Sequence, residues 1–387
     1  TQILADFGAE VIKVEHKDRR DQSRLHEPLV GERRGINSSS YFNNFNRSKL
    51  SISLNARHPK GIEILRKLIA ISDVVIENYS AGVMERWKLG YDDVIKINPE
   101  IIYISMAGLG HSGPYKHYQT FGPTIQALSG LTFLSGLPGR PPAGWGFSYM
   151  DHMGGYFAAA AILIALYHKN QTGKGQYIDL AQAEAGVALT GTTILDATVN
   201  SRPARRPGNP DSNRPKHPPA APHGVYRCAG EDRWCALAVL NDDQWQALCM
   251  VMGDPDWCRD PKYESPLNRV KYQDEIDPQI EEWTKTLDTH DLMRRLQVVG
   301  IPAGVVQSGE DLNRRDPQLE ARGFFEELDH PEIGRARFEG VPMKLSKTPG
   351  RLLHAAPLLG EHNDYVYGKL LGMSREEIRQ YTEEGVF

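Results

Sequence analysis

The sequence predicts an α/β protein in which short, largely parallel strands alternate with helices, followed by a smaller unit of mixed structure. Three observations support this fold class. Apolar strand-like segments alternate with helical segments through the first half of the chain. A proline-rich stretch, residues 202–222, then interrupts the pattern, and further strand and helix segments follow it. The length of 387 residues corresponds to about two domains.

The expected elements of the first half follow from local sequence patterns. Residues 1–7 have the pattern of a helix end that Gly8 terminates, and an apolar strand follows at 11–15. Residues 49–54 alternate between apolar and polar, as in a half-buried strand, and Pro59 opens an amphipathic helix. The later elements expected here are a strand at 74–77, a helical turn at 82–87, a strand at 101–106, a long helix at 151–169, and a strand and an Ala-rich helix after the turn at 172–176.

The second half opens with a segment in which no packed element is expected. Residues 202–222 contain seven prolines, five basic residues and one acidic residue, so we expect an extended linker. The elements expected beyond it are a strand at 233–240, helices after Asp242 and Asp277, an apolar segment at 301–306, and a tail from Arg351 with a loop and a polar terminal helix.

Composition argues against several classes of protein. The 45 basic and 49 acidic residues give a net charge of −4, which does not favour a nucleic-acid-binding surface. The longest apolar run, residues 156–167, is shorter than the roughly 18–20 residues that span a bilayer. No charged-then-apolar leader opens the chain. We therefore expect a cytoplasmic protein that binds neither nucleic acid nor membrane.

Familiar metal, nucleotide and hydrolase motifs are absent or incomplete. The four cysteines, all between Cys228 and Cys258, include no C-x2-C pair, so we expect buried thiols and no metal site. Residues 108–113 fit G-x-G-x-x-G, but Pro114 follows and no helix is expected there, which favours a tight glycine loop near a ligand over a dinucleotide site. Gly173-Lys-Gly lacks the Ser or Thr of a P-loop, and no G-x-S-x-G or H-E-x-x-H pattern occurs.

Asp151 is the candidate catalytic residue. It stands at the start of the long apolar helix and is followed by His152, Met153 and the pair Gly154-Gly155. The simplest interpretation is a helix N-cap. Two glycines in the first turn weaken a helix by roughly 0.5–1 kcal/mol each relative to alanine, so a need for close approach to the backbone would explain them. A carboxylate at this place can also be a nucleophile beside helix amides that stabilise negative charge.

Many segments, in the same order along the chain, resemble the class III coenzyme A transferases, the family of formyl-CoA transferase and the carnitine CoA transferases. Each segment is weakly specific alone, but the ordered set is very specific. The family's N-terminal strand and the glycine-proline turn after it have no counterpart in this sequence. The matching segments are 4–15, 46–54, 73–78, 82–86, 98–99, 108–114, 126–130, 172–176, 300–304 and 357–362.

The resemblance implies an architecture. Members have a Rossmann-like large domain, a smaller α+β domain and linkers that thread each subunit through its partner, which makes an interlocked homodimer. For this chain we expect the large domain to begin with residues 1–200 and to be closed by a linker and returning segment at 313–387. The proline-rich linker is expected at 201–223 and the small domain at 224–312. A proline-rich chain suits such a linker because it extends without a core of its own.

The resemblance also implies a chemistry and a set of site residues. Asp151 matches the family's catalytic aspartate, which forms an aspartyl anhydride and an aspartyl-CoA thioester while coenzyme A passes from an acyl-CoA to a small carboxylic acid. Coenzyme A is thus a substrate, and no tightly bound cofactor is expected. Gln119 and Phe121 match positions that line the family's pocket. The expected coenzyme A contacts are His16, Leu54, Asn55, Ala56, Arg57, Asn78, Tyr79, Ser80 and Arg86.

Some positions depart from the formyl-CoA transferase pattern. His16 stands where that enzyme has arginine, Gly122 stands where it has glutamate, and residues 218–224 replace its glycine-rich lid. Formate or oxalate specificity is therefore not implied.

Two other functions stay open on the sequence. One is α-methylacyl-CoA racemase activity, which has the same fold and aspartate but uses a histidine where this chain has Phe121; His117 and His152 are nearby but do not align. The other is coenzyme A binding without catalysis.

Overall fold

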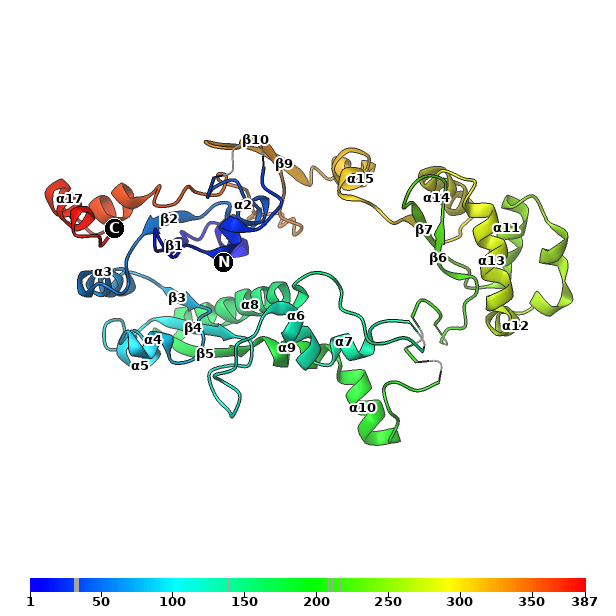
Figure 1. Ribbon diagram of the computed structural model, residues 1–387, viewed down its shortest axis with the longest axis horizontal. Helices are drawn as coiled ribbons and strands as arrows, with labels where there is room; N and C mark the ends of the chain where they lie inside the picture. The colour runs from blue at the N-terminus through cyan, green and yellow to red at the C-terminus, as the bar shows by residue number, and fades with distance from the viewer. Residues whose placement is uncertain (31–34, 138, 208, 211, 216) are drawn as a thin grey trace. The chain divides into compact units, whose positions relative to one another are not determined.

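The computed structural model of the chain divides into two compact units (Figure 1). The residues that it describes are 1–30, 35–137, 139–207, 209–210, 212–215 and 217–387. The first unit comprises Thr1–Leu131, Trp145–Thr190 and Pro317–Phe387. The second unit comprises Thr132–Gly144 and Gly191–Asp316.

The first unit contains a parallel three-stranded sheet with the order β3-β4-β5. Its strands are β3 (Val74–Glu77), β4 (Ile102–Ala107) and β5 (Gln176–Ala181), and Ile104 of the middle strand pairs with a residue of each neighbour. The first four residues of β4 are buried, as expected for a strand covered on both faces. All three strands therefore end at the same edge of the sheet.

A second parallel pair in this unit joins β1 (Ile12–Glu15) to β2 (Leu50–Ser53). Helix α3 (Pro59–Ala70) follows β2, and the His58 side chain caps its first turn by accepting from the Lys60 N–H. The buried face of α3 shares a hydrophobic core with β2 and with residues close to Phe387. The end of the chain is thus built into the same core as its first strands.

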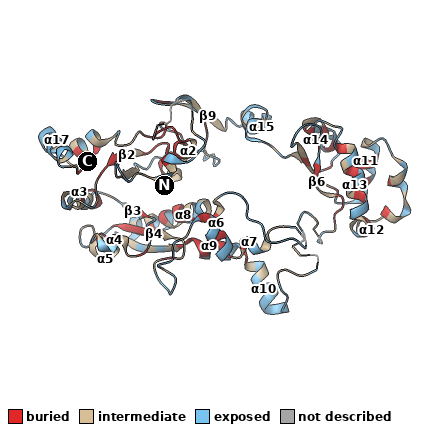
Figure 2. Ribbon diagram, viewed as in Figure 1, coloured by how far each residue is buried: buried red, intermediate tan, exposed pale blue. Residues whose placement is uncertain are grey.

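Helix α8 (Tyr149–Thr172) packs along β4 and β5 (Figure 2). Its residues Ala158 and Ile162 share a hydrophobic core with Ile104 of β4. Among the residues that the structure describes, it is the one helix long and apolar enough to cross a membrane. Packing of one face on a sheet is the behaviour of the core helix of a globular unit. Gly173, with φ of 70°, ends the helix in the left-handed conformation.

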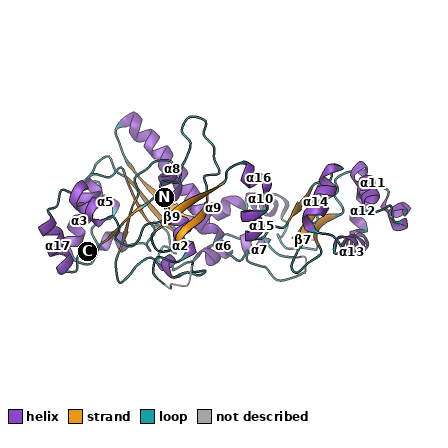
Figure 3. Ribbon diagram, turned by 90° about the horizontal axis from the view of Figure 1, so that it is seen from above, coloured by secondary structure: helices purple, strands orange, loops and turns teal. Residues whose placement is uncertain are grey.

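The second unit has an antiparallel sheet of β6 (His223–Arg227), β7 (Trp234–Ala238) and β8 (Ala303–Val305). Helices α11 (Asp242–Val251), α13 (Gln273–Thr284) and α14 (Thr289–Val298) pack beside it (Figure 3). All four cysteines are buried in this unit as free thiols, and they belong to its hydrophobic core. The unit therefore has a core of its own.

Shorter elements connect these parts. The helices among them are α1 (Gln2–Asp6), α2 (Ser40–Asn46), α4 (Val83–Arg86), α5 (Tyr91–Val94), α6 (Gly122–Leu128), α7 (Leu131–Leu134), α9 (Gln182–Leu189), α10 (Gly191–Asn200), α12 (Pro266–Lys271), α15 (Gly309–Arg314), α16 (Pro317–Ala321) and α17 (Arg375–Glu383). Single turns of 3-10 helix lie at Gln22–Leu25, Asp256–Arg259 and Pro261–Tyr263, and a π-helix lies at Asp364–Leu370. An antiparallel hairpin joins β9 (Phe325–His330) to β10 (Gly334–Glu339).

The mixed α/β fold expected from the sequence is confirmed, with two differences in where helices begin. The long helix begins at Tyr149, two residues before Asp151, and α13 begins at Gln273, ahead of Asp277. The described part of residues 202–222 contains turns and bends without a helix or strand. Short elements such as α10 and the β9–β10 hairpin were not predicted, because they have few buried residues and little periodic pattern.

Candidate functional site

The predicted coenzyme A contacts lie where parallel strands end. His16 follows β1, Leu54–Arg57 follow β2, and Asn78–Ser80 follow β3. The carboxyl ends of parallel strands are where α/β folds bind ligands, and these loops follow the ends of strands in two separate sheets. Leu54 is buried, whereas the other side chains of these three loops are half-buried or exposed. The loops therefore present polar groups that a ligand can reach.

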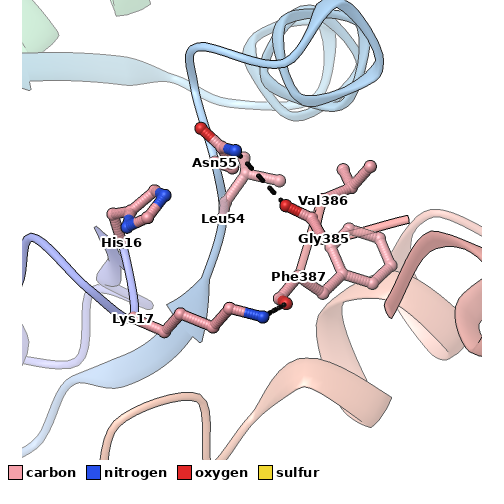
Figure 4. Close-up of a pocket in the computed structure, with 7 residues that line it drawn as sticks. All are labelled: His16, Lys17, Leu54, Asn55, Gly385, Val386 and Phe387. Carbon is pink, nitrogen blue, oxygen red and sulfur yellow. Dashed lines mark hydrogen bonds between the residues drawn. The ribbon is translucent and has the colours of Figure 1, made fainter. Parts of the chain in front are cut away.

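One small pocket brings three of the predicted residues together (Figure 4). His16, Leu54 and Asn55 line it with two unpredicted partners, Lys17 and the segment 385–387. The Asn55 backbone N–H donates to the Val386 carbonyl at 2.8 Å, and the Asn55 amide donates to the Gly385 carbonyl at 3.3 Å. The hollow is shallow: its volume of about 130 Å³ includes open solvent and is well below the roughly 300–1,000 Å³ of small-molecule sites, so it is not by itself a binding cavity.

The loop after β3 is held from within by Glu77. This carboxylate accepts from the Tyr79 backbone N–H at 2.8 Å, and the Tyr79 ring packs edge-on against Trp87 at 5.5 Å between centroids. Burial, with a contribution from the Glu77 charge, raises the pKa of Tyr79, so its hydroxyl stays neutral. Gly82 then turns the chain into α4 with φ of 86°, and Arg86 at the end of that helix is exposed.

The N-cap interpretation of Asp151 is wrong. Ser148 is the N-cap of α8, and Asp151 is the third residue of the helix. The Ser148 hydroxyl and the Gln182 amide both donate hydrogen bonds to the Asp151 carboxylate, and His152 lies close enough to act on its charge. Removal of water by surrounding protein atoms nevertheless raises the pKa of Asp151, although its side chain remains open to solvent. A partly desolvated, positioned carboxylate is suited to nucleophilic attack.

Glycines make room for this arrangement. A Cβ atom on Gly122 would lie 2.6 Å from Asp151 Oδ2, which is closer than atoms can approach. A Cβ atom on Gly154 would lie 2.9 Å from the Gln182 Cγ, so this glycine lets Gln182 reach the carboxylate. Gly155 faces open space. Gly154 thus has the close neighbour that the glycine pair in the sequence suggested, whereas Gly155 does not.

The glycine loop at 108–113 supports the segment that carries Gln119 and Phe121. A Cβ atom on Gly108 would lie 1.9 Å from Thr120 Oγ1, so only glycine fits there. No helix begins in this loop within the described residues, and α6 begins at Gly122. Gln119 and Phe121 are both exposed, and Phe121 immediately precedes the glycine that adjoins Asp151. The loop therefore packs the pocket segment and does not form the helix N-terminus of a dinucleotide site.

Sequence reasoning missed several residues of this region. Gln182 follows β5 directly, so its place at the ligand edge of the sheet was a usable signal, as was the need of Gly154 for a close neighbour. Ser148 has the residue type of an N-cap, which a shift of the expected helix start would have revealed. Segment 385–387 gave no local signal, because its contact with Asn55 joins residues 330 positions apart.

A positioned, solvent-exposed carboxylate in an α/β unit is compatible with acyl-transfer chemistry, and comparison with known families identifies the class of enzyme. The model of CoA-transferase family III matches residues 1–363. The chain belongs to this family and is a CoA-transferase, with CoA thioesters as its substrates. The family resemblance inferred from the sequence is therefore confirmed.

Named relatives are similar along nearly the whole chain. The succinyl-CoA–D-citramalate CoA-transferase of Chloroflexus aurantiacus is 31% identical over 97% of this chain and 91% of its own. The succinate–glutarate CoA-transferase of Agrobacterium fabrum is 32% identical over 97% and 92%. The formyl-CoA:oxalate CoA-transferase of Streptomyces coelicolor is 33% identical over 100% and 94%.

Solved structures support the fold. The crystal structure of a CAIB/BAIF family protein from Brucella suis is 31% identical, with a TM-score of 0.85 over 95% of this chain and 94% of that one. The structure of Rv3272 from Mycobacterium tuberculosis, at 23% identity and a TM-score of 0.72, shares the fold over 94% and 92% of the two chains.

Proposed function

We propose that Asp151 is the nucleophile that carries coenzyme A from an acyl-CoA donor to a carboxylic acid acceptor. The supporting observation is a carboxylate in the first turn of α8 that two neutral donors, Ser148 and Gln182, hold open to solvent. Helix amides at this end favour the negative charge that develops during acyl transfer. The N-terminal turn of α8 would therefore be the reaction centre.

The reaction follows four exchanges at carbonyl carbons. The Asp151 carboxylate attacks the donor thioester, the C–S bond breaks, and a mixed anhydride and the coenzyme A thiolate form. The thiolate attacks the aspartyl carbonyl, which releases the donor acid and leaves an aspartyl-CoA thioester. The acceptor carboxylate displaces the thiolate to give a second anhydride. Attack of the thiolate on the acceptor's acyl carbon then yields the new acyl-CoA and free Asp151. No net proton transfer is needed.

Coenzyme A would be held by the loops that follow β1, β2 and β3. Arg57 and Arg86 are exposed and can pair with its phosphates, while the half-buried His16 and Asn55 can contact it from the loops after β1 and β2. The names of the relatives lead us to propose a small carboxylic acid as the acceptor. The intact set of residues around Asp151 argues against a protein that only binds coenzyme A.

The proposed assembly is the family's interlocked homodimer of cytoplasmic subunits, with a Rossmann-like large domain. We retain 1–200, 201–223, 224–312 and 313–387 as the proposed large-domain, linker, small-domain and returning segments. Exposed apolar side chains on α8 and α10 support a partner, because monomers rarely expose such surfaces. They are Tyr156, Phe157, Leu163, Ile164, Tyr167, Ile194, Leu195 and Val199. Light scattering should give about twice the 43.3 kDa chain mass at nanomolar concentration; a stable, active monomer would contradict the dimer.

The direct test of the proposed function is the Asp151→Asn variant. Asparagine keeps the shape and can still bond Ser148 and Gln182, but its amide cannot form the anhydride. We expect transfer to fall by about 10⁴-fold or more while the melting temperature and coenzyme A binding are retained. Near-normal transfer by a well-folded variant would refute the nucleophile assignment.

A further inference from the structure

Aromatic rings surround the start of α8 in a connected series. The rings of Phe45 and His152 lie 5.1 Å apart, and those of His152 and Phe147 lie 6.0 Å apart. Such spacings are typical of packed aromatic pairs. The members of this aromatic series are His26, Tyr41, Phe45, Trp145, Phe147, Tyr149 and His152. Because His152 follows Asp151 directly, the series passes beside the proposed nucleophile.

The aromatic series is open to ligands where it adjoins Asp151. Phe147 is 52% exposed, and it immediately precedes the hydroxyl residue that holds the Asp151 carboxylate. From another segment, Phe121 is 72% exposed and adjoins the glycine that makes room for the same carboxylate. Large aromatic side chains are costly to leave in water, and they line the apolar part of most small-molecule sites. Two such residues, from two parts of the sequence, are thus the immediate chain neighbours of residues that lie against Asp151.

The hydrogen-bond donors of Asp151 include no cation that could pair with a second carboxylate of the substrate. The donors, Ser148 and Gln182, are neutral side chains, and the neighbouring titratable side chain that lowers the pKa of Asp151 is His152. A substrate with another carboxylate would need a cation or several donors at its far end, because a poorly paired charge beside apolar rings is strongly disfavoured.

We infer that the acyl group transferred by this enzyme has an apolar, aromatic-sized tail, so that the substrates are an aromatic monocarboxylic acid and its coenzyme A thioester. This inference rests on the proposed function, since it concerns the group bound to Asp151 during transfer. Phe147 and Phe121 are the specificity-determining residues: they cover the tail while Asp151 exchanges at the carbonyl carbon.

The experiment compares acyl donors and acceptors on the full-length enzyme. Phenylacetyl-CoA, acetyl-CoA and succinyl-CoA are each offered with the two carboxylates that differ from their own acyl group among phenylacetate, acetate and succinate, and kcat/KM is measured for every such pair. We expect kcat/KM for phenylacetyl-CoA to exceed that for succinyl-CoA by about tenfold or more, which is the discrimination that contact with an apolar pocket provides.

Variants identify the residues responsible. Phe147→Ala and Phe121→Ala should each lower kcat/KM for phenylacetyl-CoA by about tenfold and that for acetyl-CoA by less than about threefold. Because both side chains are largely exposed, the variants should fold, and a melting curve checks this. Ile71→Ala is the matched control, because it removes an exposed apolar side chain between α3 and the start of β3, at the opposite edge of the sheet from the site. This variant should leave kcat/KM unchanged for both phenylacetyl-CoA and acetyl-CoA.

The outcomes separate this inference from the proposed function. A preference for succinyl-CoA, or equal losses for phenylacetyl-CoA and acetyl-CoA in the Phe147 and Phe121 variants, would overturn the aromatic substrate and leave the transferase intact. Failure to transfer from any donor, with no covalent labelling of Asp151, would overturn the proposed function and the inference with it.

Discussion

The side chains around Asp151 differ in chemical type from those of the pocket that residues 385–387 help to line. Around Asp151, neutral donors from α8 and α9 hold a carboxylate, and Gly122 and Gly154 leave space for it. In the pocket, Lys17 and His16 bring basic groups beside a loop that hydrogen-bonds to the chain end. The difference suggests a division of labour, in which one region performs acyl transfer and the other recognises coenzyme A. Variants in the two regions should therefore affect kcat and KM separately.

The largest effect short of losing the carboxylate is expected from Gly122→Ala. The added Cβ would lie 2.6 Å from both Asp151 Oδ2 and Ser148 Cβ, so the carboxylate and the serine that donates to it must shift. A displacement of about 1 Å costs on the order of 10²-fold in rate, and we expect kcat to fall by that factor with little change in KM for the acyl-CoA. Steady-state kinetics measure both constants.

Gly155→Ala is the matched control for this prediction. Its Cβ would meet no atom within 4 Å, and alanine stabilises a helix interior by roughly 0.5–1 kcal/mol over glycine. We expect an unchanged kcat and a slightly raised melting temperature. Equal kinetic losses in both glycine variants would show that the helix turn, and not the carboxylate, is what the substitutions disturb.

A smaller effect is expected from Gln182→Ala, which removes one donor to Asp151. A hydrogen bond to a charged group contributes about 1.5–3 kcal/mol, so kcat should fall by about 10- to 100-fold. The amide favours the ionised carboxylate, so its loss should raise the pKa of Asp151 further.

The pH dependence of kcat tests whether the pKa of Asp151 is raised, and whether Gln182→Ala raises it further. Only the ionised carboxylate attacks, so activity should be lost as pH falls through the pKa of Asp151. Because desolvation raises this pKa, the loss should begin above the ordinary aspartate value of about 3.9, and at still higher pH in Gln182→Ala. An acid limb that does not move in the variant would argue that Gln182 has no influence on the nucleophile.

In the second region, Arg57→Ala should raise KM for the acyl-CoA by about tenfold and leave kcat nearly unchanged. Its guanidinium is exposed, and a phosphate contact of this kind contributes about 1.5–3 kcal/mol, weakened by solvent. The increase in KM should shrink at high salt. Lys96→Ala, which removes an exposed cation near the start of β4, is the control and should change neither constant. A fall in kcat with constant KM would contradict the division between the regions.

The smallest effect is expected in an assay for isomerisation, which measures deuterium uptake at the α-carbon of an acyl-CoA. Phe121 cannot carry a proton, so the α-carbon of 2-methylacyl-CoA should take up no deuterium from heavy water during turnover. Mass spectrometry of the recovered thioester measures this. Exchange at a rate comparable to transfer would favour a racemase.

The two regions also differ in how far the sequence predicted them. Strand ends are local features, so the placement of His16, Asn55 and Tyr79 after β1, β2 and β3 followed from apolar patterns and motif order. The start of α8 was misplaced by two residues, because the aromatic residues before Asp151 give no clear helix signal, and Ser148 was overlooked with it. The contribution of segment 385–387 depends on tertiary packing of Phe387 against Tyr367 at 3.8 Å, which no local pattern encodes.

The measurement that tests the central claim most directly is covalent trapping during turnover. With acyl-CoA and acceptor present, hydroxylamine attacks an aspartyl thioester or anhydride and leaves a hydroxamate on the residue that carried it. Peptide mass spectrometry should place this label on Asp151 in the parent enzyme and find none in Asp151→Asn. Full transfer activity without a label on Asp151, or a label on another carboxylate that persists in Asp151→Asn, would contradict the account.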